Sequence, residues 1–157
     1  MARPARQVLA LASLVVLAGC AGLPAPDATT TAPVDPALVG STTGGGRCVD
    51  DPMHGFVVRS ESAAHGGRLV HVAGNVTVPG AHYTVAEGSP TLTRTGPGAY
   101  RLEVNTTESA RKPARPCETG AVVHYEATIR VPATDGFELV VRHDGRPVTG
   151  VGSASET

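Results

Sequence analysis

Six histidines are the side chains of this sequence best suited to binding a metal ion or transferring a proton near neutral pH. They are His54, His65, His71, His82, His124 and His143. His71 and His82 share the outward face of one expected hairpin. They stand roughly 20 Å apart along it, because each residue of a strand advances the chain by about 3.3 Å. These two side chains therefore cannot share one ion.

The other histidines form two weaker candidate groups. His124 shares an expected outer face with Glu126 and, across a hairpin, with Asp144, and the alternative there is a solvated cluster of charges. His54 and His65 lie in loops near two aspartates. Neither group shows a ligand spacing typical of a metal centre. We therefore predict no metal site, and a loop-histidine site is kept as the alternative.

No arrangement typical of an enzyme is found in the sequence. A nucleophile needs a base in contact, and no serine has a histidine beside it in the expected registers. The glycines at residues 44–46 precede no helix that could bind phosphate. A net charge of −1, with one local basic cluster at residues 111–115, provides no basic stripe for nucleic acid. We predict that the protein is not an enzyme, needs no cofactor and binds no nucleic acid.

The N-terminus has the layout of a secretory signal. Arginines open the chain, and an apolar run of about 11 residues follows, too short to span a bilayer as a helix. The run ends in Leu17-Ala18-Gly19-Cys20. This ending resembles the lipobox of prokaryotic lipoproteins, in which the cysteine is acylated and the chain is cut just before it. The alternative is an ordinary signal peptide with an incidental cysteine.

The resemblance implies a location for the mature protein. It implies a lipoprotein signal peptide over residues 1–19 and a lipid anchor, such as palmitate, on Cys20. Two or more acyl chains make a stable anchor. We therefore expect a protein that is held at the extracytoplasmic face of the cell membrane by its lipid anchor. Its predicted partners are that membrane and a protein that the sequence does not identify.

The remaining cysteines follow from this location. Once lipidation has consumed Cys20, Cys48 and Cys117 form an even pair in a compartment that permits disulfides. A bond closing a loop of about 70 residues contributes about 4 kcal/mol in the loop-entropy model. Two unpaired buried thiols are the alternative. A zinc site is less favoured, because neither cysteine belongs to a C-x-x-C motif.

Residues 20–47 are expected to form a flexible tether. The segment is rich in proline, alanine, threonine and glycine and shows no apolar period. Residues 48–157 are expected to form the folded domain. Two sequons, at Asn75 and Asn105, fall on outward strand positions of that domain and would be glycosylation sites in a host cell that uses them.

From residue 55 onward the apolar residues alternate with a period of two, which predicts strands. We expect about seven or eight strands in a small antiparallel β-sandwich, immunoglobulin-like or related, with a small barrel as the alternative. A true immunoglobulin domain is not supported, because the sequence contains no tryptophan.

Three hairpins are expected from the pairing of apolar faces. The first joins residues 68–78 to 81–87, with Val76 opposite Tyr83. The second joins residues 90–95 to 99–106, with Leu92 opposite Leu102 inside. The third joins residues 121–131 to 137–143, with Ile129 opposite Leu139 inside. The same register places three polar pairs outside, each contributing roughly 0.2–1 kcal/mol: Arg130 with Glu138, Glu126 with Arg142, and His124 with Asp144.

The functional hypothesis from the sequence is a non-enzymatic extracytoplasmic lipoprotein. It would present a small disulfide-bonded β domain for binding or for envelope structure. The alternative is a ligand- or metal-carrying lipoprotein that uses loop histidines.

Overall fold

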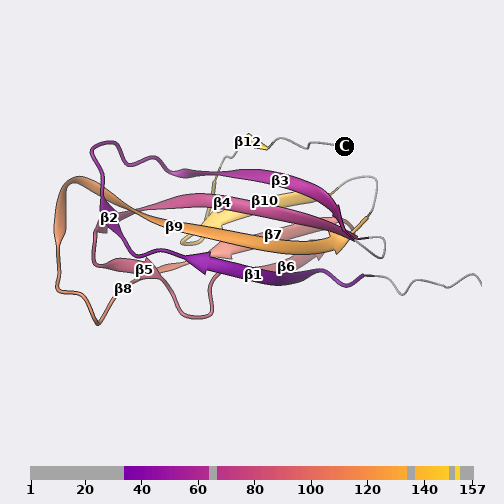
Figure 1. Ribbon diagram of the computed structural model, residues 1–157, viewed down its shortest axis with the longest axis horizontal. Helices are drawn as coiled ribbons and strands as arrows, with labels where there is room; N and C mark the ends of the chain where they lie inside the picture. Colours follow the sequence, from indigo (N-terminus) through magenta and orange to yellow (C-terminus); the bar gives the residue numbers. More distant parts are fainter. Residues whose placement is uncertain (1–33, 64–66, 134–136, 149–150, 153–157) are drawn as a thin grey trace, which may run out of the picture. The chain divides into compact units, whose positions relative to one another are not determined.

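The fold is described by a computed structural model, which covers residues 34–63, 67–133, 137–148 and 151–152. These residues form two main sheets and a small two-stranded one (Figure 1). The first sheet contains β1 (Ala37–Thr43), β2 (Arg47–Cys48), β3 (Gly55–Ala63), β4 (Gly67–Gly80), β9 (Pro116–Pro132) and β12 (Val151–Gly152). The second contains β6 (Thr91–Gly96), β7 (Ala99–Val104), β10 (Glu138–His143) and β11 (Arg146–Pro147). The small sheet pairs β5 (Tyr83–Val85) with β8 (Thr106–Glu108).

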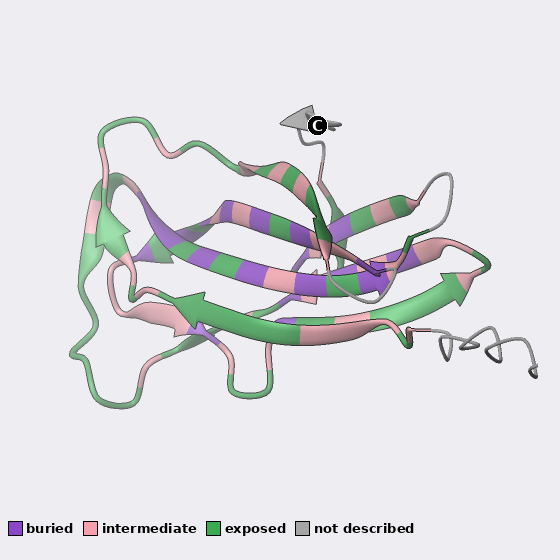
Figure 2. Ribbon diagram, turned by 45° about the vertical axis from the view of Figure 1, so that its right-hand side comes forward, coloured by how far each residue is buried: buried purple, intermediate pink, exposed green. Residues whose placement is uncertain are grey.

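The first sheet is built around β4 and β9. The two strands pair antiparallel from Gly67 opposite Pro132 to Val78 opposite Ala121. Their side chains alternate between buried and exposed along the ladder (Figure 2). The buried positions of β4 and β9 join those of β7 and β10 in one apolar core. The two main sheets therefore pack face to face, with valine as the main residue between them.

The prediction of an all-β, sandwich-like fold is confirmed. The two main sheets are separate hydrogen-bonded units in the described residues, which agrees with a sandwich and not with the closed alternative. None of the described residues forms a helix long and apolar enough to cross a membrane. The second hairpin is confirmed in detail: β6 and β7 pair with Leu92 opposite Leu102 and Thr91 opposite Glu103.

The predictions of the first and third hairpins are wrong, because the strands concerned pair with other strands than those expected. β4 pairs with β3 and β9, while the strand expected beside it, β5, pairs with β8. β10 pairs parallel with β7, not antiparallel with β9. The polar pairs expected between residues 121–131 and 137–143 therefore do not form across a ladder, and Arg142 lies opposite Glu103 instead. The apolar period fixes which face of a strand is buried, but not which strand lies beside it.

The expected tether is also corrected in part. Residues 1–33 lie outside the described residues, but Ala37–Thr43 forms β1 and pairs with β9 from Ala37 opposite Arg130 to Thr43 opposite Tyr125. Only Leu38 of this strand packs against the core. An edge strand gains backbone hydrogen bonds without needing an apolar face, which explains why no apolar period marks it. The folded part of the chain thus begins before Cys48.

The disulfide between Cys48 and Cys117 is confirmed. The two Cα atoms are 5.5 Å apart, and the bond closes a separation of 69 residues. Cys48 ends the short strand β2, which pairs with β9 at Ala121. Cys117 lies near the start of β9. The bond thus ties the N-terminal edge of the fold to its longest strand.

Candidate functional site

A buried histidine and a buried tyrosine join the two main sheets. His143 ends β10 and is 2% exposed, and Tyr125 lies in the middle of β9 and is fully buried. The Oη atom of Tyr125 and Nε2 of His143 are 2.9 Å apart, and the rings meet edge to face at 87°. This hydrogen bond is the polar contact around which the candidate site is built.

His54 extends the contact to the protein surface. It lies just before β3 and is exposed, yet its Nε2 atom is 3.3 Å from Nδ1 of His143. Its other ring nitrogen, Nδ1, accepts a hydrogen bond of 3.3 Å from the backbone N–H of Thr77. These contacts thus form a continuous chain from the backbone of β4 to the core. We call it the histidine relay, and it consists of Thr77, His54, His143 and Tyr125.

The backbone N–H of Thr77 sets the direction of every proton in the histidine relay. A backbone N–H can only donate, so Nδ1 of His54 is unprotonated and its proton sits on Nε2. His54 therefore donates to Nδ1 of His143, whose proton must then sit on Nε2. His143 in turn donates to the oxygen of Tyr125. With both histidines neutral, every ring nitrogen of the histidine relay is used within the protein.

Burial determines the charge state of the two inner residues. Loss of solvent contact, then the nearby His54, lower the pKa of His143 to about 4, against an opposing effect of Asp144. Burial also raises the pKa of Tyr125 above its ordinary value. Both groups are therefore neutral at physiological pH, as a hydrogen-bond chain inside an apolar core requires.

A glycine makes room for the tyrosine. Gly74 of β4 lies directly opposite Tyr125 in the ladder. A Cβ atom at this position would approach Oη of Tyr125 to 2.6 Å and the backbone oxygen of Gly55 to 2.8 Å. Any side chain at residue 74 would therefore displace the tyrosine hydroxyl that His143 contacts.

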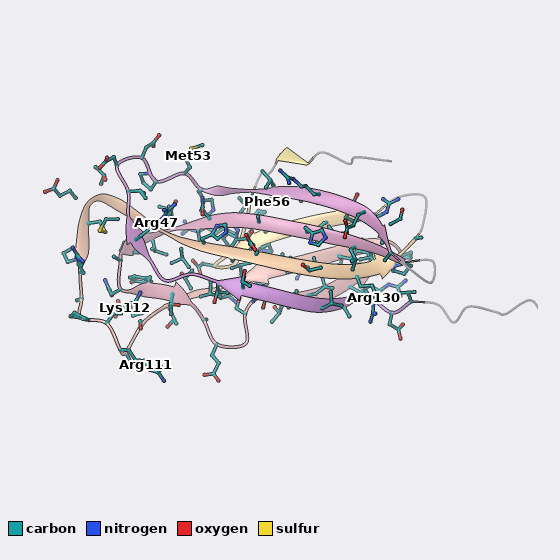
Figure 3. The ribbon with its side chains drawn as sticks, in the orientation of Figure 1. Arg47, Met53, Phe56, Arg111, Lys112 and Arg130 are labelled. Carbon is teal, nitrogen blue, oxygen red and sulfur yellow. A yellow bond between two sulfur atoms is a disulfide. The ribbon has the colours of Figure 1, made fainter. Side chains whose placement is uncertain are left out.

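A shallow groove borders the histidine relay, with an open volume of about 470 Å³. It combines apolar surface with a few polar groups: Met53, His54, Gly55, Phe56, Val57, Ala73, Gly74, Asn75 and His124. Met53 and Val57 are 71% and 49% exposed. Figure 3 shows Met53 on the segment that leads into β3. At the polar side, Nδ1 of His124 lies 3.2 Å from Oδ1 of Asn75.

The other histidine predictions have separate outcomes. His71 binds Thr128 and Glu61, and His82 lies near Glu108. His124 is exposed on β9, whereas His143 is buried on β10 of the other main sheet. The expected group of His124, Glu126 and Asp144 is wrong, because Asp144 accepts hydrogen bonds from Thr106 instead. His65 and Cys20 lie outside the described residues.

The structure also places the two asparagines of the sequons and allows a search for groups of metal-binding side chains. Asn75 lies on the outer face of β4, beside His124, and Asn105 is exposed between β7 and β8, so glycosylation at both stays a prediction. Within the described ranges, no group of three or more histidine, cysteine or acidic side chains is arranged to hold a metal ion.

The sequence reasoning missed the histidine relay. The signal was present in the strand period, because His143 follows Leu139 and Val141 on the inward side of its strand and Tyr125 is inward on its own. A histidine on an inward position needs a buried partner. The wrong pairing of β9 with β10 concealed that partner. No family model, curated protein or solved structure matches this chain.

Gly74→Ala should destabilise the domain by about 1–3 kcal/mol, because the new methyl group overlaps Tyr125 and the Gly55 backbone. Urea unfolding measures the loss. Gly40→Ala is the matched control, since a Cβ atom there meets nothing within 4 Å and its stability should change little. Equal stability of the two variants would show that Gly74 is not needed for the tyrosine.

Acid should weaken the domain through His143. Between the ordinary histidine pKa of 6.5 and about 4, the unfolded chain binds a proton that the folded domain resists. Stability therefore falls as the pH falls through this window, by up to about 3 kcal/mol. Urea unfolding across the window should show a flatter pH dependence for His143→Gln. The control His71→Gln, at an exposed histidine, should keep the slope of the unmodified chain, and equal slopes for both variants would contradict this assignment.

Proposed function

We propose that the chain is an extracytoplasmic lipoprotein whose disulfide-bonded β domain serves as a binding module and not as an enzyme. One observation carries the second half of this proposal: His143 is 2% exposed, and both its ring nitrogens are hydrogen-bonded within the protein. A general base must reach the proton that it removes. The histidine relay is therefore better suited to hold the two sheets together than to act on a substrate.

The groove beside the histidine relay is the surface best suited to a ligand or partner. Binding sites are mostly apolar, with a few polar groups that fix orientation. Met53 and Val57 provide exposed apolar surface, while Asn75 and His124 provide polar atoms at one side. Because His54 forms part of both the groove and the histidine relay, a partner docking there would contact the structure that links the sheets.

The proposed location rests on the lipobox at Leu17-Ala18-Gly19-Cys20 and on the compartment that a disulfide requires. An anchor on Cys20 would be separated from β1 by residues 21–36. Fully extended, these residues reach at most about 55 Å. The domain would thus work close to the membrane surface.

A metal-carrying lipoprotein is the second candidate, and one distance favours it. Nε2 of His54 and Nδ1 of His143 lie 3.3 Å apart, which suits two ligands of one tetrahedral ion at about 2.0–2.1 Å. The Thr77 contact argues against it. To bind a metal through Nε2, neutral His54 would carry its proton on Nδ1, where it would face the N–H of Thr77. We therefore favour the hydrogen-bonded arrangement.

Cys20→Ser should abolish acylation and release the protein from membranes or leave it unprocessed. Labelling with a radioactive fatty acid and fractionation of cells measure both effects. Gly19→Ala is the matched control, because it keeps a small residue before the cysteine and should leave anchoring intact. A Cys20→Ser protein that is processed and membrane-bound like the unmodified chain would overturn the anchor.

The purified chain, incubated with copper or zinc and then desalted, should retain far less than one equivalent of metal. Nitrogen-15 NMR of the histidine rings should find the proton of both His54 and His143 on Nε2. Elemental analysis of His54→Gln, with His71→Gln as the control, completes the test. Stoichiometric metal that only His54→Gln removes would replace the binding-module proposal with the carrier.

A further inference from the structure

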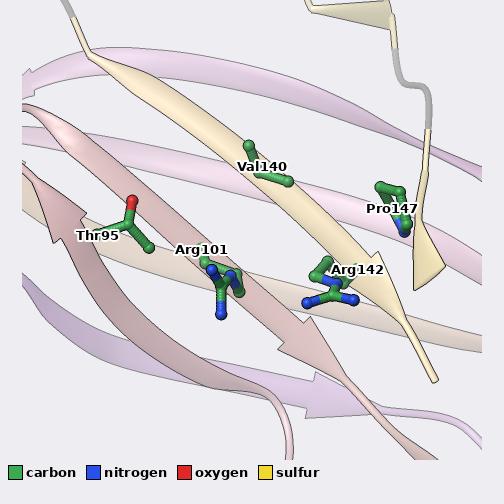
Figure 4. Close-up of a pocket in the computed structure, with 5 residues that line it drawn as sticks. All are labelled: Thr95, Arg101, Val140, Arg142 and Pro147. Atoms are coloured by element: carbon green, nitrogen blue, oxygen red, sulfur yellow. The ribbon is translucent and has the colours of Figure 1, made fainter. Parts of the chain in front are cut away.

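The outer face of the second sheet carries a second pocket, on the face of β10 opposite to the buried His143. Its volume is about 250 Å³, and its lining comes from all four strands of that sheet: Thr95, Arg101, Val140, Arg142 and Pro147 (Figure 4). Val140 of β10 lies opposite Arg101 of β7, and Arg142 follows two residues later on the same face. The register therefore places two guanidinium groups on adjacent strands beside one hollow.

Neither guanidinium has an acidic partner among the described residues. The ion pairs found there all involve histidines, and the pocket lining includes no carboxylate. Glu103 lies opposite Arg142 in the ladder, but no ion pair between them is found among the described residues. Arg101 and Arg142 therefore lie half-buried beside one hollow without a direct carboxylate contact, and an anion bound there would relieve their mutual repulsion.

Arg142 is oriented by a contact with the backbone of the following turn. Its Nη2 atom donates to the backbone oxygen of Gly145 in the turn after β10. Its Nε atom is buried without a hydrogen-bond partner. The contact with Gly145 thus orients the guanidinium on the outer face, where the side chain lines the pocket.

We propose that the pocket between Arg101 and Arg142 binds a phosphate group. Arginine presents planar, charged donors that match phosphate oxygens. The hydroxyl of Thr95 adds a further donor on the same side. Two guanidinium groups and a hydroxyl offer more donors than one planar carboxylate can accept, whereas a phosphate has oxygens directed to several sides. Val140 and Pro147 give the pocket an apolar wall, against which the carbon skeleton of a phosphate ester packs.

This site does not depend on the proposed function, since it shares no residue with the groove or the histidine relay. The phosphate could come free from solution or as the end group of a larger ester, such as a lipid headgroup. Inorganic phosphate and glycerol 3-phosphate represent these two sources. Tighter binding of glycerol 3-phosphate assigns the site to an ester, and tighter binding of inorganic phosphate assigns it to the free ion.

The test is calorimetric titration of the detergent-solubilised full chain with inorganic phosphate at low ionic strength. We expect one saturable site, with acetate at least tenfold weaker. Arg101→Gln should weaken phosphate binding at least tenfold, a loss of about 1.4 kcal/mol. Arg142→Lys keeps the charge but loses the planar fork, and should weaken binding at least about threefold.

Arg130→Gln is the matched control, because Arg130 is an exposed arginine of β9, on the other main sheet (Figure 3). It should bind phosphate like the unmodified chain. Arg101→Lys replaces Arg101→Gln if the neutral variant does not fold. Absence of a saturable site, displacement of phosphate by chloride at equal ionic strength, or an equal loss in Arg130→Gln would each overturn the proposal.

Discussion

The antiparallel ladder between β4 and β9 is the constraint on which the rest of this structure depends. It extends along nearly the whole of both strands and buries one face of each. The outer edge of β4 is then taken by β3, and that of β9 by β1 and β2. With both edges occupied, the strands that follow in sequence cannot pair with them. β5 and β10 must leave the sheet, and β10 crosses to the second sheet to lie parallel to β7.

The candidate site is a consequence of that crossing. An antiparallel hairpin of β9 and β10 would have kept Tyr125 and His143 in one sheet as positions along neighbouring strands. In the structure they belong to opposite sheets and meet across the core, 2.9 Å apart. The same crossing places Val140 and Arg142 beside Arg101, so the arginine pocket also results from the parallel pair.

The features that the sequence predicted correctly are local ones, and the features that it missed depend on contacts between distant parts of the chain. Alternation of side chains is local, and it correctly placed Leu102 of β7 and Ile129 of β9 inside. A tight turn is local too, and the β6–β7 register was predicted correctly across its short glycine-rich loop. The choice of a distant partner is not local. The polar pairs expected for Arg130, Glu126 and His124 were each too weak to outweigh a long apolar ladder.

The edge strand β1 was missed for a related reason. Its stabilisation comes from backbone hydrogen bonds to β9 and from one side chain, Leu38. Amino-acid composition reflects the side chains and not the hydrogen bonds that the backbone makes. A stretch of threonine, serine and glycine therefore predicts a tether even where its backbone completes a sheet. Cys48, which follows, then fixes that edge to β9 through Cys117.

A core made mainly of valine does not by itself fix how the two main sheets are aligned with each other. The histidine relay provides the contacts that fix this alignment. Faces made mainly of valine attract each other without direction, because hydrophobic contact depends on area and not on angle. Two such sheets could pack in several offsets at similar free energy. The hydrogen bond from His143 to Tyr125 is directional, and leaving either group unpaired in the core would cost about 1–3 kcal/mol. His54 and the backbone of Thr77 hold His143 from its other side. The polar contacts therefore select one offset of the two sheets, and that offset determines the inner faces and leaves the outer faces free to bind.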